Sequence, residues 1–302
     1  MKSLVKKIII ICTLCLRSLW LLKILQRFYS IDLIRRISVF FDPNYIRKVT
    51  TYQYKQKIVE VKGEHWKLYV DVNDHIGFRS FIENQPFENS VYQIAKKIGL
   101  TECDVILDIG ANIGSASVPI CSEIGCELAA IEASKENAIL LLKNIVENDV
   151  RAHISIVALT DANSSNKFLK LYLRDGNRGA NSLLEDWNPS IDDSSSEMVP
   201  TITLDEYIRK SNFKNRIGLT KIDVEGAELD VIKGGSLFLK ENNAPILMEY
   251  RVNVNDRVRE NLKELLTFMT NHYRVIGLDN KGKEIPFDPS KSYENILFEK
   301  IQ

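Results

Sequence analysis

The stretch "VILDIGANIGSASV", residues 105–118, decides the fold of this chain. It begins as an apolar run that ends at Asp108, and Gly110 and Gly114 then frame a turn that leads into a helical pattern. Glycine accepts positive φ angles and lets the backbone approach a ligand closely. A glycine-rich turn between a strand and a helix binds nucleotides in many α/β folds. We therefore expect an α/β domain with a ligand at this turn.

Six further apolar runs of strand length follow this one. Helical patterns separate most of them, and they cover residues 127–133, 153–159, 217–224, 245–250, 273–278 and 295–300. Runs that are apolar on both faces are typical of a parallel sheet covered by helices on both sides. The pattern predicts a seven-stranded, mostly parallel sheet within a domain of residues 103–302.

Two features of this domain are clear from local patterns. Residues 134–147 predict a helix with Ser134 as its N-cap and with a buried stripe formed by Ile139, Leu140, Leu142 and Ile145. The alternation loosens at 166–203, where the polar stretch 174–196 predicts an inserted loop and a candidate substrate lid.

Residues 51–102 predict a separate segment that precedes the sheet. The sequence "KIVEVKGEHWKLYVDV" (57–72) is typical of two strands joined through Gly63. A helix over residues 88–98 follows, and Gly99 closes it.

Residues 1–50 form a basic, apolar N-terminal segment. Residues 1–48 carry ten Lys/Arg and two Asp, a charge of +8 that the rest of the chain cancels. Because the excess of Lys and Arg is confined to one end of the chain, a broad surface that binds nucleic acid is not expected. The apolar run 8–16 is followed at once by Arg17, without the small-residue cleavage site of a signal peptide. A helix in the membrane surface fits these charges better than a spanning helix, while packing on the domain or on a partner chain is the alternative.

The odd number of cysteines, five, without a ligand or disulfide pattern, favours a reducing cytoplasm.

The type of ligand follows from the charges at the turn. A pyrophosphate-binding turn has the spacing G-x-G-x-x-G, whereas this chain has G-x-x-x-G preceded by Asp108. A carboxylate there repels phosphate and suits a cationic ligand. Glu132, at the end of the next run, can accept hydrogen bonds from two ribose hydroxyls. A ligand with a ribose, a positive centre and no phosphate is S-adenosylmethionine.

Several motifs together resemble those of the FkbM family of S-adenosylmethionine-dependent methyltransferases, which act mainly on hydroxyl oxygens. They run in order from about residue 70 to the C-terminus and include "VILDIGANIG" (105–114), "IEAS" (131–134), "TITLDEYI" (201–208), "KIDVEGAE" (221–228) and "PILMEY" (245–250). The resemblance implies a Rossmann-like methyltransferase fold with an antiparallel C-terminal strand. It also implies acceptors such as sugar or polyketide hydroxyls.

The resemblance assigns cofactor roles to seven positions. The methionine end of the cofactor would contact Asp108, Gly110, Asn112 and Gly114, the ribose would contact Glu132, and the backbone near Ala158 would line the adenine. Glu88 resembles an acidic residue that faces the cofactor, although a solvated charge at a helix N-terminus is the alternative reading.

Catalysis is expected from three carboxylates at the carboxyl ends of strands. A hydroxyl nucleophile must give up its proton, which calls for a carboxylate or a histidine. Asp223 and Glu225 follow one run and Glu249 ends the next, so the three should meet at one rim of the sheet. Asp223 is the first candidate, Glu225 the second, and Glu249 would orient the acceptor.

Other readings of these residues are open at this point. Three carboxylates could bind a divalent metal, but no dedicated ligand set accompanies them, so we predict no metal. The charge of Glu225 and Glu228 could simply favour a helix N-terminus. A short-chain dehydrogenase would need Tyr-x-x-x-Lys late in the sheet, whereas Tyr92-x-x-x-Lys96 lies before it. A non-catalytic scaffold would not need Asp108 and Glu132. The sequence therefore favours O-methyl transfer to a sugar or glycan hydroxyl.

Overall fold

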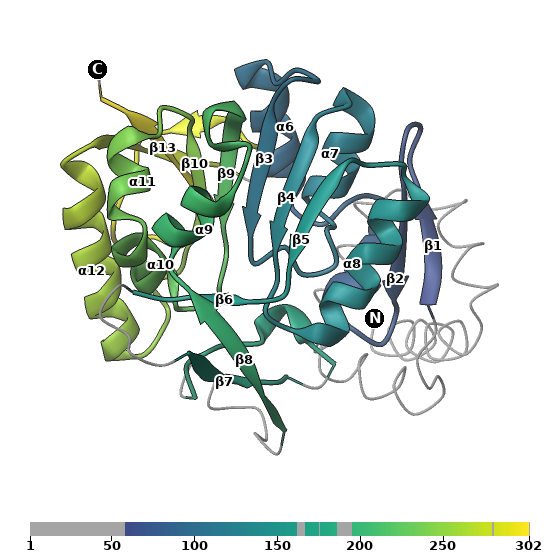
Figure 1. Cartoon of the computed structure of the whole chain (residues 1–302), viewed down its shortest axis with the longest axis horizontal. Coiled ribbons are helices and arrows are strands. Elements are labelled where there is room, and N and C mark those ends of the chain that lie inside the picture. The colour runs from purple at the N-terminus through teal and green to yellow at the C-terminus, as the bar shows by residue number, and fades with distance from the viewer. Residues whose placement is uncertain (1–57, 162–166, 175, 186–194, 280, 302) are drawn as a thin grey trace, which may run out of the picture.

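A computed structural model describes residues 58–161, 167–174, 176–185, 195–279 and 281–301. Its main sheet has eight strands in the order β12-β11-β13-β10-β9-β3-β4-β5 (Figure 1). The strand bounds are β3 Val105–Ile109, β4 Glu127–Ile131, β5 Ala152–Ser155, β9 Ile217–Ile222, β10 Ile246–Tyr250, β11 Tyr273–Leu278, β12 Glu284–Ile285 and β13 Tyr293–Lys300.

The strand directions confirm the predicted α/β fold. The neighbours in β5-β4-β3-β9-β10 are parallel, β13 is antiparallel to β10, and β11 is antiparallel to β13. The two-residue strand β12 adds an eighth strand to the seven that we expected. The run 153–159 does not form one strand. Its end, β6 (Ala158–Leu159), leaves the main sheet because it pairs with β8 (Ser196–Ile202) of the insertion.

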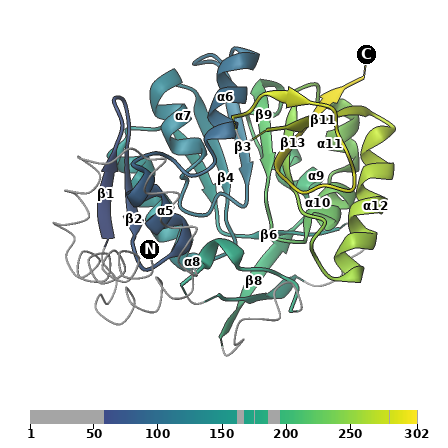
Figure 2. The ribbon, with the colours of Figure 1, turned by 180° about the vertical axis from the view of Figure 1, so that it is seen from behind.

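Helices cover the two faces of the main sheet. One face packs against α5 (His75–Glu83), α6 (Asn89–Ile98), α7 (Ser117–Ile124) and α8 (Lys135–Glu147). The other packs against α9 (Leu204–Lys210), α10 (Glu228–Gly234), α11 (Ser236–Glu241) and α12 (Asp256–Thr270). Figures 1 and 2 show α12 at one end of the molecule and the β1–β2 hairpin at the other. The hairpin, β1 (Ile58–Lys62) and β2 (Lys67–Asp71), is antiparallel as predicted.

The buried side of α8 differs from our prediction. Ile139 and Leu142 are 71% and 51% exposed, whereas Asn144 is fully buried. The reason is the free edge of β2. The Asn144 side chain accepts a hydrogen bond from Tyr69 N at 2.7 Å and donates to Tyr69 O at 3.2 Å. Asn148 pairs in the same way with the backbone of Lys67. Two asparagines thus replace a neighbouring strand and fix the hairpin on α8.

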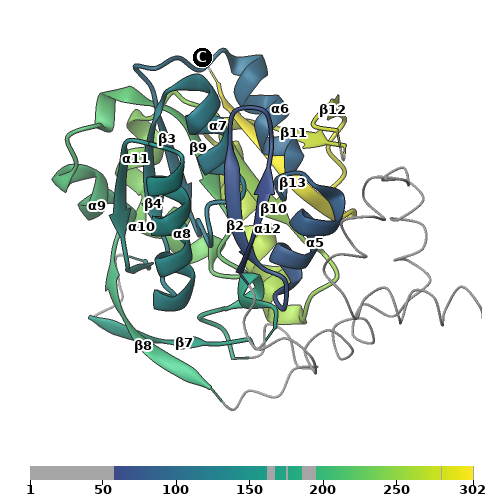
Figure 3. The ribbon, with the colours of Figure 1, turned by 90° about the vertical axis from the view of Figure 1, so that its right-hand side faces the viewer.

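The predicted inserted loop contains regular structure. β7 (Phe168–Tyr172) and β8 form an antiparallel pair, and the 3-10 turn η1 (Arg178–Ala180) follows β7. Figures 1 and 3 show this small sheet lying across one end of the main sheet. The insertion therefore has a defined position beside the strand ends. The lid prediction falls partly on residues 186–194, which lie outside the described residues.

The N-terminal prediction lies outside the part of the chain that the structure describes, since that part begins at Ile58. Among the helices it does describe, none has the length and apolar character needed to cross a membrane.

Candidate active site

A cavity opens at the carboxyl ends of the parallel strands. Its walls come from the segments after β3, β4, β9 and β10, from the start of α6 and from the insertion. This is the edge at which open α/β sheets bind ligands. Eight of the ten predicted site residues line it, namely Glu88, Gly110, Asn112, Glu132, Ala158, Asp223, Glu225 and Glu249.

The turn after β3 has the backbone that its glycine predicts. Gly110 has a φ of +82°, and a Cβ there would lie 1.8 Å from the carbonyl oxygen of Asp223. The chain after β3 therefore touches the chain after β9, and only glycine allows this contact. Asn112, also at positive φ (53°), donates its backbone N–H to Glu132 Oε2 at 2.7 Å. The turn is thereby fixed to the end of β4.

Glu132 is buried and held by the backbone at both carboxylate oxygens. Oε2 accepts from Asn112 N, and Oε1 accepts from Ser134 N at 2.8 Å. Burial raises the pKa of Glu132 to about 7, and the two backbone N–H groups oppose this rise. Each oxygen keeps a lone pair for a further donor. The side chain therefore suits the two hydroxyls of a ribose.

Asp108 and Gly114 do not line the cavity. Asp108 is 1% exposed, and burial raises its pKa while Lys221 opposes the rise. Among the described residues, its Oδ1 has no hydrogen-bond partner. Gly114 has a φ of +75°, and a Cβ there would lie 2.6 Å from Val118 and 2.7 Å from Leu141. Its position serves the packing of α8 against the turn.

A buried lysine joins two of the predicted carboxylates. Lys221 is the register partner of Asp108 and is 4% exposed. Its Nζ lies 3.1 Å from Glu88 Oε2 and 3.0 Å from Asp223 Oδ2. Although burial disfavours the ammonium, Asp223 and Glu88 together raise the pKa of Lys221 well above its ordinary value. Lys221 is therefore a cation at the centre of the site.

Glu88 is not the solvated helix charge that was the alternative reading. It precedes α6 at a φ of +62° and is 9% exposed. Burial raises its pKa to about 8, against the opposing effect of Lys221. Glu88 is therefore mostly protonated at neutral pH and lies against the cation.

The two carboxylate oxygens of Asp223 differ in their hydrogen bonds. Oδ2 is held by Lys221, while Oδ1 has no hydrogen-bond partner among the described residues. Burial alone would raise its pKa, but Lys221 and then Arg251 lower it below the ordinary value. At neutral pH the residue is therefore a carboxylate, and it lines the cavity while its Oδ1 is buried.

Glu225 and Glu249 complete the acidic group. One carboxylate oxygen from each of Asp223, Glu225 and Glu249 lies within 4.8 Å of the others. Burial, followed by Asp223 and Glu225, raises the pKa of Glu249 well above its ordinary value, although Arg251 forms an ion pair with it. Glu249 therefore favours the neutral acid, which can donate a hydrogen bond.

Glu228 has a role beyond the helix N-terminus that we predicted for it. It is 5% exposed, and its carboxylate accepts the backbone N–H groups of Val224 at 3.1 Å and Gly226 at 3.1–3.2 Å. These bonds hold the turn on which Glu225 lies at a φ of +51°. Glu228 thus fixes the turn that follows β9.

Sequence reasoning missed three cations of this site, Lys221, Arg251 and Arg178. Lys221 carried a signal, since it lies two residues before Asp223 and strand alternation places both on one face. Arg251 lies two residues after Glu249 in the same way. No sequence pattern predicted that Arg178 lies in the site, because it belongs to the insertion. Tyr92 and Lys96 both contact Glu123 instead of lining the cavity.

A family model for the "Methyltransferase FkbM domain" matches residues 108–275, more than half of the chain. The chain belongs to the FkbM methyltransferase family. S-adenosylmethionine is accordingly its cofactor. No curated protein matched the sequence.

Solved methyltransferase structures are similar to this FkbM domain at low identity. An FkbM methyltransferase from Methylobacillus flagellatus has 13% identity and a TM-score of 0.43, over 73% of this chain and only 50% of its own. An O-methyltransferase from Bacillus cereus in complex with SAH has 11% identity and a TM-score of 0.42, over 71% and 80%. The M. jannaschii protein TYW2 in complex with AdoMet has 13% and 0.39, over 82% and 89%. The chain thus spans half the length of the first of these proteins.

Proposed function

We propose that this FkbM protein transfers the methyl group of S-adenosylmethionine to a hydroxyl oxygen, with Asp223 as the proton acceptor. One observation carries the proposal. Asp223 lies on the cavity wall as a carboxylate of lowered pKa, and its buried Oδ1 has no hydrogen-bond partner among the described residues. Bound S-adenosylmethionine supplies a methyl group on a sulfonium, which is open to in-line displacement.

Four side chains of the cavity would have separate roles in this reaction. Asp223 would accept a hydrogen bond from the acceptor hydroxyl, align its oxygen, and take its proton as the new carbon–oxygen bond forms and the carbon–sulfur bond of the methyl donor breaks. Lys221 holds Oδ2 and so orients the carboxylate. Glu249, as the neutral acid, donates a hydrogen bond to the acceptor, and Glu225 is the second candidate for the proton. The proton leaves Asp223 for solvent after the product departs.

The hydrogen-bonding groups of the acceptor end suit a polyhydroxylated acceptor such as a sugar. Asp223, Glu225 and Glu249 gather there with the cation Arg251. Vicinal hydroxyls donate to carboxylates in charge-assisted hydrogen bonds.

The cofactor roles proposed at the other end follow the same geometry. Gly110 and Asn112 would contact the methionine portion, Glu132 the ribose, and Ala158 the adenine. Glu88 and Lys221 lie between the two ends. Asp108 would act through Lys221, and Gly114 through the packing of the turn.

The Asp223→Asn variant tests the proton acceptor. We expect it to bind S-adenosylmethionine as the wild type does in calorimetric titration, and to lose methyl transfer to neutral glycosides by about a hundred-fold or more. Glu264→Gln, on the exposed side of α12, is the matched control. Turnover by Asp223→Asn at the wild-type rate would remove Asp223 from the mechanism.

We also propose, from composition alone, that residues 1–50 contact a membrane surface, which would suit a membrane-linked glycan acceptor. The basic charge predicts binding to anionic vesicles. Deletion of residues 1–48 should abolish that binding while cofactor binding persists. Equal vesicle binding without these residues would refute the idea.

A further inference from the structure

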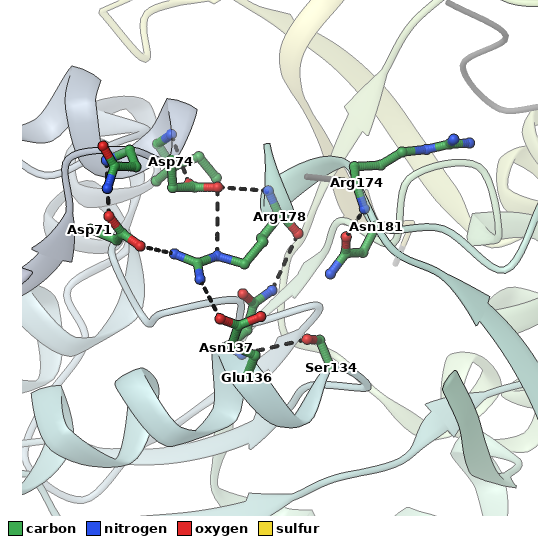
Figure 4. Close-up of polar contacts among 10 residues, drawn as sticks. Asp71, Asp74, Ser134, Glu136, Asn137, Arg174, Arg178 and Asn181 are labelled. Carbon is green, nitrogen blue, oxygen red and sulfur yellow. Dashed lines mark hydrogen bonds and ion pairs between the residues drawn. The ribbon is translucent and has the colours of Figure 1, made fainter. Parts of the chain in front are cut away.

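Arg178 is the centre of a polar network at the cofactor end of the cavity (Figure 4). Its Nη2 lies 2.7 Å from Asp71 Oδ2, and its Nη1 lies 2.8 Å from Glu136 Oε1. Its backbone N–H donates to Asp74 Oδ2 at 2.6 Å, and its carbonyl oxygen accepts from Asn137 Nδ2 at 3.2 Å. One residue of the insertion therefore joins the turn after β2 to the first turn of α8.

The partners of Arg178 belong to rigid parts of the fold. Asp74 is the N-cap of α5, where its Oδ1 accepts from Ile76 N at 3.1 Å. Asp71 accepts from Asn73 N at 2.9 Å through its other oxygen. Asn144 of α8 fixes β2 to the same helix that carries Glu136. The guanidinium is only 18% exposed, so water screens these contacts less than it screens surface ion pairs.

The network places the insertion directly over the cofactor turn. A Cβ on Gly179 would lie 2.4 Å from Ile76 Cδ1 and 3.2 Å from Asn112 Nδ2. Leu171, Arg178, Gly179, Asn181 and Leu183 of the insertion line the cavity. At the acceptor end, Ser182 Oγ donates to Glu225 O at 2.7 Å. The insertion is thus a roof with one anchor beside the turn after β3, through Arg178 and Gly179, and another at the turn after β9, through Ser182.

We infer that Arg178 is a positioning residue that holds this roof over bound S-adenosylmethionine and so sets the rate at which the cofactor leaves. A ligand beneath the roof departs only after the contacts of Arg178 break. Loss of hydrogen-bonded charge pairs acts mainly on dissociation rates. The inference rests on the cofactor of the family and not on the identity of the acceptor, so failure of the proposed acceptor chemistry leaves it unaffected.

The test is a dissociation experiment on the full chain. Protein loaded with radiolabelled S-adenosylmethionine is mixed with an excess of unlabelled cofactor, and the loss of bound label gives koff. We expect Arg178→Met to raise koff by about ten-fold or more, since several charge-assisted hydrogen bonds are lost. Arg178→Lys should have a koff between those of the wild type and Arg178→Met, because a single ammonium cannot span Asp71 and Glu136 as the planar guanidinium does.

Two further variants keep the result decisive. Glu136→Gln removes one partner whose side chain is 55% exposed, and it should raise koff by a smaller factor in the same direction. Arg259→Met removes an ion pair with Asp256 on α12 and should leave koff unchanged. A lower fraction of folded protein would reduce the bound label without changing koff. Wild-type koff in Arg178→Met, or in Glu136→Gln if Arg178→Met does not fold, would overturn the inference.

Discussion

Replacement of Glu132 with Gln tests the cofactor end of the site in two ways at once. In the wild type both carboxylate oxygens accept backbone N–H groups and face the cavity. Glutamine keeps the shape of the side chain but offers one acceptor and no charge. We therefore expect weaker cofactor binding together with a changed pH dependence of stability.

The size of the stability effect follows from the raised pKa. Burial moves the pKa of Glu132 from 4.5 to about 7. Below pH 4.5 the group is protonated in both the folded and the unfolded chain and has no effect. Between pH 4.5 and 7 only the unfolded chain loses the proton, so the folded state becomes less stable as the pH rises. At about 1.36 kcal/mol for each pKa unit, the loss reaches roughly 3 kcal/mol above pH 7.

The assay is urea unfolding of cofactor-free protein between pH 5 and 8. The free energy of unfolding of the wild type should fall over this range by up to roughly 3 kcal/mol more than that of Glu132→Gln. Glu264→Gln, half-exposed on α12, should follow the wild-type curve. In calorimetry, Glu132→Gln should raise the Kd for S-adenosylmethionine about ten- to hundred-fold, through lost charge-assisted bonds of about 1.5–3 kcal/mol. Parallel stability curves, or an unchanged Kd, would refute the reasoning.

Three further predictions concern the turn and the charges around it. Gly110→Ala should abolish cofactor binding in calorimetry, because its Cβ would lie 1.8 Å from Asp223 O; wild-type affinity would contradict the close approach. Lys221→Met should cost about 3–5 kcal/mol in urea unfolding, because the buried carboxylate of Asp223 loses its cation, and it should move the acidic limb of the pH–rate profile upward as the pKa of Asp223 rises. An unmoved limb would count against that ion pair. Turnover should survive treatment with EDTA, since Lys221 and Arg251 already supply positive charge. If EDTA abolished turnover and added Mg²⁺ restored it, Asp223, Glu225 and Glu249 would hold a metal.

The main strands and their mostly parallel arrangement were predictable because the strands are buried apolar runs separated by helical patterns. Strands such as β3 and β11 match their predicted bounds within a residue or two. The buried face of α8 was not predictable in this way. Its pattern offers Ile139 and Leu142 as core residues, but the edge of β2 needs hydrogen-bond partners, and this need turns Asn144 inward. Hydrophobic periodicity cannot report a requirement for backbone hydrogen bonds.

The candidate site was predictable where its residues end strands of the parallel sheet. Glu132, Asp223 and Glu249 all line the cavity for that reason. Residues whose placement depends on long-range packing were harder to foresee. Arg178 reaches the site because η1 folds onto the turns after β2 and β4, and no local pattern reports that contact. The position of Lys221 could have been predicted, because residues two apart in a strand lie on the same face of the sheet.

Transfer of a ¹³C-methyl group tests the central claim most directly. The full chain would be incubated with S-adenosylmethionine labelled at the methyl carbon and with a panel of neutral glycosides, and the products would be resolved by mass spectrometry and NMR. The account predicts a product whose labelled carbon is bonded to an oxygen, absent with Asp223→Asn. Label bonded only to nitrogen or carbon, or equal product from Asp223→Asn, would contradict it.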